Sequence, residues 1–182
     1  MTMNAAVNTL RLLAAVVALA GANAAVASKK AGMLARAELE ATAGNQARGW
    51  IKLANTHDGV HLRGEVDGLR AGSIHGFHVH EKGDCSAADA SSAGGHFNPG
   101  GQPHGKVAHG SHHAGDMDNI IADARGRARV DIHLEGVSLA SGMANSIAGR
   151  AIVVHAAPDD YRSQPAGNAG ARLACGVISV NP

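Results

Sequence analysis

QARGWIKLANTHDGVHLRGEV, residues 46–66, is the stretch that decides the fold. Apolar and polar residues alternate in residues 46–54 and again in residues 60–66, which is the period of half-buried β-strands. Residues 55–59, NTHDG, lie between these two segments and are of the kinds that form turns. The stretch therefore predicts two antiparallel strands joined by a short connection.

The same two-residue period recurs along the chain, which predicts further strands at residues 73–80, 119–122, 127–134, 150–155 and 173–180. Residues 34–42 are expected to form another strand, although a helix fits that segment as well. Short strands with glycine-rich turns favour an antiparallel sandwich or barrel of one domain. Residues 82–115 and 156–172 do not fit as strands, and long connections of this kind are usually functional.

The first residues have the layout of a secretory signal. Arg11 precedes the apolar run 12–20, and small residues follow, with Ala22-Asn23-Ala24 and Ala25-Val26-Ala27 as candidate cleavage sites. A membrane anchor is the alternative, but the run is short and Asn23 interrupts it. We expect a signal peptide over residues 1–27 and a mature domain over residues 28–182, exported to the periplasm or beyond and free of the membrane.

Composition argues against nucleic acid as a partner. Cleavage after Ala27 removes the charge of Arg11, so the formal net charge of +1 becomes 0. A neutral chain has no basic stripe for phosphates, and aromatic residues, at 2% of the chain, are too few to stack bases.

The chain has two cysteines, Cys85 and Cys175. In an exported protein such a pair is expected to form a disulfide, here closing a loop of about 90 residues. Two free thiols acting as metal ligands are the alternative. Neither cysteine has a second one near it in sequence, which favours the disulfide.

Three of the histidines on predicted strands could share one metal site. His78 and His80 are two residues apart, so one strand presents both rings on the same face. His155 ends the apolar run 151–154 and can approach from a neighbouring strand. Coordination by imidazoles alone suits copper.

A second group lies in the glycine-rich loop and comprises His96, His104, His113 and Asp116. Three nitrogens and one carboxylate oxygen suit a closed zinc site, which is full at four ligands. Seven candidates therefore indicate two metals, and His96 could serve both through its two ring nitrogens. His109 or His112 could replace His113, but the His-x-x-Asp spacing favours His113.

Four segments together resemble copper/zinc superoxide dismutases: GFHVHE (76–81), GGHFNP (94–99), HAGD (113–116) and NAGARLACGVI (168–178). The resemblance runs from about residue 34 to residue 180. The export signal and the short late loop are similar to the bacterial secreted branch of the family. The fold that the resemblance implies is an eight-stranded Greek-key barrel or sandwich with two long functional loops.

The resemblance implies one copper and one zinc per subunit and the conversion of superoxide to oxygen and hydrogen peroxide. Copper would be held by His78, His80, His96 and His155, and zinc by His96, His104, His113 and Asp116. It also implies that Arg172 guides the anionic substrate and that Cys85 pairs with Cys175. Asp159, rather than its neighbour Asp160, would link His78 to His104. A homodimer is one assembly that the family allows, and the sequence assigns no interface.

Two other functions compete with the dismutase. A copper carrier or zinc buffer on the same fold would need neither Arg172 nor a bridging histidine. A purely structural secreted domain would leave the ligands unexplained. The presence of every ligand together with Arg172 favours the enzyme, and Lys82 and Lys106 are candidates to help attract superoxide.

Overall fold

The computed structural model describes residues 34–107 and 109–180. The expected signal peptide, residues 1–27, lies outside the described residues. Within the described ranges no helix is long and apolar enough to span a membrane. The helical structure of these ranges is one 3-10 turn, η1 (Ser91–Ala93).

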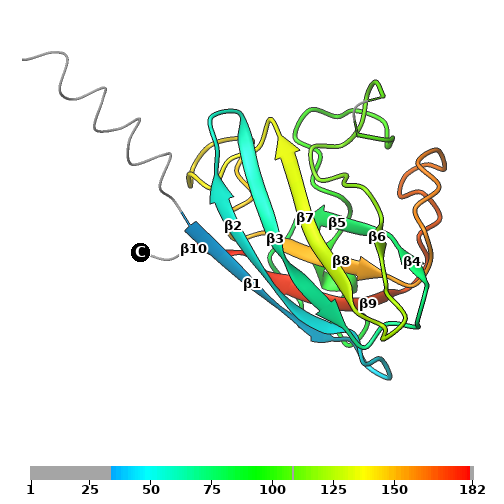
Figure 1. Ribbon diagram of the computed structural model, residues 1–182. Coiled ribbons are helices and arrows are strands. Elements are labelled where there is room, and N and C mark those ends of the chain that lie inside the picture. Colours follow the sequence, from blue (N-terminus) through cyan, green and yellow to red (C-terminus); the bar gives the residue numbers. More distant parts are fainter. Residues whose placement is uncertain (1–33, 108, 181–182) are drawn as a thin grey trace, which may run out of the picture.

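Ten strand segments make up the fold of the described residues. They are β1 (Leu34–Ala41), β2 (Arg48–Asn55), β3 (Gly59–Asp67), β4 (Ile74–His75), β5 (Phe77–His80), β6 (Ile120–Ile121), β7 (Ala128–Glu135), β8 (Ala151–His155), β9 (Arg172–Val177) and β10 (Ser179–Val180). Eight of them form one sheet in the order β5-β8-β9-β1-β2-β3-β7, with β10 paired to β1, while β4 and β6 form a separate pair. The sheet curls on itself (Figure 1) and its strand pairs are antiparallel, as predicted.

The alternating segments form strands for the expected reason. In β1 every second residue is buried, with Ala35, Ala37 and Leu39 at most 3% exposed. Residues 34–42 therefore form a strand and not a helix, apart from Thr42 at the end. The turn between β2 and β3 is closed by the backbone N–H of Thr56, which donates to the Gly59 carbonyl at 2.9 Å.

Two predicted strands are each divided in the structure. Residues 73–80 become β4 and β5, because the backbone groups of Gly76 bond to Ala157 and His155 instead of continuing one ladder. Residues 173–180 become β9 and β10, because the N–H of Ile178 turns to the Arg150 carbonyl. Alternation alone does not reveal such changes of partner.

The inner faces of both halves of the sheet pack into one core. Its largest fully buried side chains include Phe77, Leu39, Ile51, Leu53, Leu62, Met117, Leu134 and Ile152. These residues come from strands far apart in sequence, so the core fixes how the sheet curls. β5, β8 and β9 are consecutive neighbours in the sheet and lie at one side of it.

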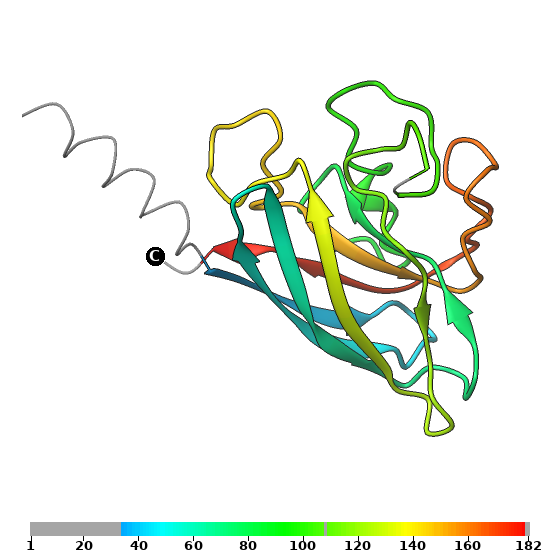
Figure 2. The ribbon, with the colours of Figure 1, turned by 45° about the horizontal axis from the view of Figure 1, so that its top comes forward.

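The two long connections lie side by side there. One joins β5 to β6 and the other joins β8 to β9; they are green and orange in Figure 2. A direct contact joins them, because the Gln164 side chain bonds to the backbone of His104. The segments predicted as functional loops thus meet over the ends of β5 and β8.

Candidate metal centre

Buried ligand side chains converge where the two loops meet. They form two groups, and within each group one ligand atom per residue lies within 4.8 Å of the others. The first group is His78, His80, His96 and His155, and the second is His96, His104, His113 and Asp116. His96 belongs to both groups.

Strand geometry positions the first group. His78 and His80 lie on β5, which pairs with β8, and both are at most 1% exposed. His155 ends β8 at a register shift between Val154 and His155. Such irregularities re-aim a side chain, and here the shift lies where β8 delivers its histidine to the group.

The loop brings the second group to the same strand. His96 forms an antiparallel bridge with His80, and Asp116 forms one with His78. Backbone hydrogen bonds flank both bridges, including one from the N–H of Val79 to a loop carbonyl. The loop therefore returns to β5 twice and carries one ligand into place each time.

Hydrogen bonds decide which ring nitrogens can bind a metal. A backbone carbonyl can only accept, so the Nδ1 of His80, 2.9 Å from the Gly94 oxygen, must carry the hydrogen. The Nδ1 of His155 faces the Gly170 oxygen at 3.4 Å in the same way. Each ring then has a lone pair on Nε2, and these two Nε2 atoms lie 3.3 Å apart.

Asp159 joins the two groups from behind. Its Oδ2 lies 2.7 Å from His78 Nε2 and its Oδ1 lies 2.9 Å from His104 Nε2, with all three side chains fully buried. The carboxylate accepts from both rings, which leaves both Nδ1 atoms with lone pairs. Gly167 allows this approach, because a Cβ there would overlap Asp159 Oδ1.

His96 lies between the groups. Its Nδ1 is 2.8 Å from Asp116 Oδ1, and its Nε2 faces the first group. Four buried ring nitrogens have no hydrogen-bond partner in the described structure: His78 Nδ1, His96 Nε2, His104 Nδ1 and His113 Nδ1. Buried nitrogens are rarely left so, and convergent lone pairs of this kind fit metal ions.

Burial keeps three histidines of the first group neutral. Loss of solvation lowers the pKa of His78 to about 4, that of His155 to about 3 and that of His80 to about 2. Burial alone would raise the pKa of Asp116, but hydrogen bonds from His96 and from the backbone N–H of His113 lower it overall. Neutral imidazoles and an ionised carboxylate are the forms that bind metals.

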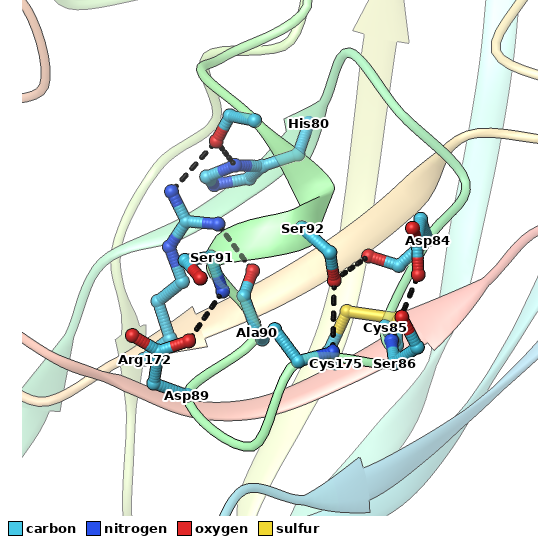
Figure 3. Close-up of a disulfide and its surroundings, with 12 residues drawn as sticks. His80, Asp84, Cys85, Ser86, Asp89, Ala90, Ser91, Ser92, Arg172 and Cys175 are labelled. Carbon is cyan, nitrogen blue, oxygen red and sulfur yellow. Dashed lines mark hydrogen bonds between the residues drawn. A yellow bond between two sulfur atoms is a disulfide. The ribbon is translucent and has the colours of Figure 1, made fainter.

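A cavity of about 450 Å³ opens onto His80, His96, His155 and Arg172. Arg172 begins β9, and its guanidinium donates to the carbonyls of Ala90 and Gly94 (Figure 3). The Gly94 oxygen thus accepts from both Arg172 and His80. A larger hollow of about 680 Å³, along β6 and β7, contains none of the ligands.

A disulfide holds the segment that carries these carbonyls. Cys85 and Cys175 are bonded, with their Cα atoms 5.7 Å apart (Figure 3). Cys175 lies three residues after Arg172 on β9, so the bond ties the loop segment 85–94 to the strand that presents the guanidinium. The expected disulfide is present.

The structure decides between the histidines that the sequence offered as alternative zinc ligands. His113, not His112 or His109, belongs to the second group; the His112 ring instead lies 2.8 Å from the His113 carbonyl. His75 is buried, with its ring nitrogens bonded to the Ser73 hydroxyl and the His155 carbonyl. It therefore supports the first group without joining it.

Sequence reasoning missed Gln164, Gly167 and Asn119. Gln164 bonds both backbone groups of His104, and Asn119 bonds both backbone groups of Asp159. None of them lies in a ligand-like spacing. Gly167 has a positive φ of 65°. A glycine in a long loop can indicate such a backbone conformation, and this is the one signal that the sequence offered.

Comparisons with known proteins agree with this geometry. The family profile described as copper/zinc superoxide dismutase (SODC) matches residues 47–178. The chain belongs to this family. Superoxide dismutase [Cu-Zn] 2 of Aquifex aeolicus is 45% identical to it over 147 residues, 79% of this chain and 85% of that protein.

Two further relatives show the range of the family. The extracellular superoxide dismutase [Cu-Zn] of Brugia pahangi is 40% identical over 142 residues, covering 73% of this chain and 69% of that one. The crystal structure of a double mutant of a SOD-like protein from Bacillus subtilis aligns with a TM-score of 0.73 at 38% identity. That alignment covers 79% of this chain and 96% of the other.

Proposed function

We propose that this chain dismutates superoxide at a copper ion bound beside a zinc ion, with His96 as a ligand of both. The observation that carries the proposal is the double membership of His96. Its two ring nitrogens face two different groups of convergent, buried ligands. A simple metal buffer gains nothing from a ligand held between two ions.

The ring nitrogens assign the ligand atoms, and His96 Nδ1, which donates to Asp116 in this structure, would lose its proton on binding zinc. Copper would be held by His78 Nδ1 and by the Nε2 atoms of His80, His96 and His155. Zinc would be held by the Nδ1 atoms of His96, His104 and His113 and by Asp116. When bound, copper accepts an electron from one superoxide and returns it to a second, whereas zinc has no redox chemistry and keeps the loop in shape.

Arg172 binds the substrate. It lines the same cavity as three of the copper-group histidines, and two backbone carbonyls hold its guanidinium in place. A fixed positive charge at the cavity attracts a small anion and stabilises negative charge there. Lys106 is one of the lysines that could help attract superoxide. Its Nζ lies 5.3 Å from the centre of the Tyr161 ring.

His96 supplies a proton. Two superoxide anions and two protons give one oxygen molecule and one hydrogen peroxide, so the half-reaction that forms peroxide needs protons. The Nε2 of His96 faces the copper group and can take up a proton whenever it is not a ligand, while Nδ1 stays beside Asp116. Asp159 keeps His78 and His104 in the tautomers that leave Nδ1 free.

One assay tests the function. Superoxide decay is followed with the mature protein loaded with copper and zinc, and then with zinc alone. The proposal expects rapid decay that depends on copper and is lost in His96→Ala. A metal buffer or carrier, the second candidate, would bind both metals and leave superoxide decay at the rate of free solution.

We also propose that the enzyme works outside the cytoplasm, in the periplasm, where it protects the cell envelope. The support is the signal-like layout of residues 1–27, the disulfide, and a relative named as extracellular. Cell fractionation with mass spectrometry of the purified chain tests this. A mature protein that begins near Ser28 in the periplasmic fraction is expected, and an intact first residue in the cytoplasm would contradict it.

A further inference from the structure

A third group of ligand-type side chains lies outside the metal centre. It consists of Asp58, in the turn between β2 and β3, and His133 and Glu135, at the end of β7. One ligand atom from each lies within 4.8 Å of the others, and His133 Nε2 is 3.0 Å from Asp58 Oδ1. This surface cluster shares no residue with the two buried groups.

Strand geometry places the cluster on the outer face of the sheet. His133 and Glu135 are two residues apart on β7, with buried Leu134 between them, so their side chains share one face. The register partner of Glu135 on β3 is Gly59, which has no side chain. No side chain on β3 therefore lies directly opposite Glu135, which leaves room for the side chain of Asp58, the residue before Gly59.

The turn holds Asp58 against the end of β7. Its carbonyl accepts from the backbone N–H of Gly136 at 2.8 Å, directly after Glu135. Its carboxylate accepts from the Thr56 hydroxyl at 3.0 Å. Hydrogen bonds thus hold both the backbone and the side chain of Asp58 beside His133 and Glu135.

The charges of the cluster are unbalanced. Among the described residues, no lysine or arginine lies within 4.0 Å of the carboxylate of Asp58 or Glu135. The next carboxylate along β7, Asp131, has Arg63 at 3.6 Å. The basic neighbours of Asp58 are two histidines, His133 at 3.0 Å and His57 at 3.3 Å from its Oδ1. Two neighbouring carboxylates without a lysine or arginine partner favour a bound cation.

We propose that Asp58, His133 and Glu135 form a third metal site, an open one for Zn²⁺ or a similar divalent ion. One imidazole nitrogen and two carboxylate oxygens are zinc ligands, and water would complete the fourth position. His133 and Glu135 also line the same groove as His112, the neighbour of zinc-group His113. The site therefore lies beside the loop that carries the zinc ligands, and its ion exchanges with solvent.

Calorimetric titration with Zn²⁺ tests the site. The protein, already loaded with copper and zinc, is expected to bind one further equivalent. His133→Ala and Glu135→Gln should weaken this binding at least ~10-fold. His109→Ala removes another exposed histidine, outside the cluster, and should leave this binding unchanged. All three variants should keep dismutase activity.

Three results would overturn the proposal. They are the absence of a further equivalent, a further equivalent that survives unchanged in His133→Ala and Glu135→Gln, and its equal loss in His109→Ala. Because the readout is zinc binding and not activity, its failure is distinguishable from failure of the dismutase assignment.

Discussion

Gln164→Ala tests whether the late loop holds the proposed zinc ligand His104 in place. The Gln164 side chain accepts from the His104 N–H at 2.9 Å and donates to the His104 carbonyl at 2.8 Å. His104 is 3% exposed, so water does not easily replace these bonds. Each is worth ~1 kcal/mol net, and losing both costs ~2 kcal/mol.

Zinc binds to the ordered arrangement of the loop, in which both hydrogen bonds are formed. Loss of ~2 kcal/mol from that arrangement should therefore weaken the zinc affinity ~30-fold. Competition with a chromogenic chelator measures it. Gln164→Glu keeps the acceptor but not the donor and should fall between the alanine variant and the unaltered protein. Gln102→Ala is the matched control. The Gln102 side chain lies in the connection from β5 to β6, where it donates to the carbonyl of Gly100 and to none of the proposed ligands.

A zinc affinity of Gln164→Ala within threefold of the unaltered protein would refute this reasoning. It would mean that Asp159, which also bonds His104, positions the ligand without help from the late loop. Thermal unfolding of the metal-free variant shows separately whether the substitution weakens the fold itself.

Three further outcomes are expected. Arg172→Glu should slow dismutation at least about 10-fold and reverse its salt dependence, while Arg162→Glu, in the loop that precedes β9, should change it little; equal effects would contradict the substrate role of Arg172. Cys85→Ser should lower the free energy of unfolding by ~4.6 kcal/mol, the chain-entropy value for a loop of this size, in denaturant titrations of the oxidised and variant proteins; a loss below 1 kcal/mol would contradict it. The metal-free protein should lose stability as the pH falls from about 6.5 toward 4, because unfolding lets His78, His80 and His155 take up protons that burial excludes. The free energy of unfolding should fall by about 1.4 kcal/mol per pH unit for each ring. A flat profile in that window would show that these rings are not buried and neutral.

Much of the fold follows from local pattern. Alternation placed all the main strands within a few residues, because one face of each strand packs on a common core. Alternation did not predict the breaks in two strands, at Gly76 and at Ile178, where the backbone changes its hydrogen-bond partner. The alternation of apolar and polar residues carries no information about hydrogen-bond partners in distant segments.

The candidate site shows the same division. The spacing of His78 and His80 and the step from His113 to Asp116 were sufficient to nominate ligands. The residues that orient them were not predictable, because Gln164 lies 60 positions from His104 and bonds its backbone, which has no sequence signature. Gly167 is needed because Asp159 and His104 approach it in space and because its φ is positive.

The central claim is that one histidine lies between two different metal ions. Crystals of the protein loaded with copper and zinc, measured at the absorption edges of both metals, test it most directly. The account predicts a copper peak among His78, His80 and His155, a zinc peak among His104, His113 and Asp116, and the His96 ring between them. A single metal peak, or two peaks with His96 bound to only one of them while copper is oxidised, would contradict it.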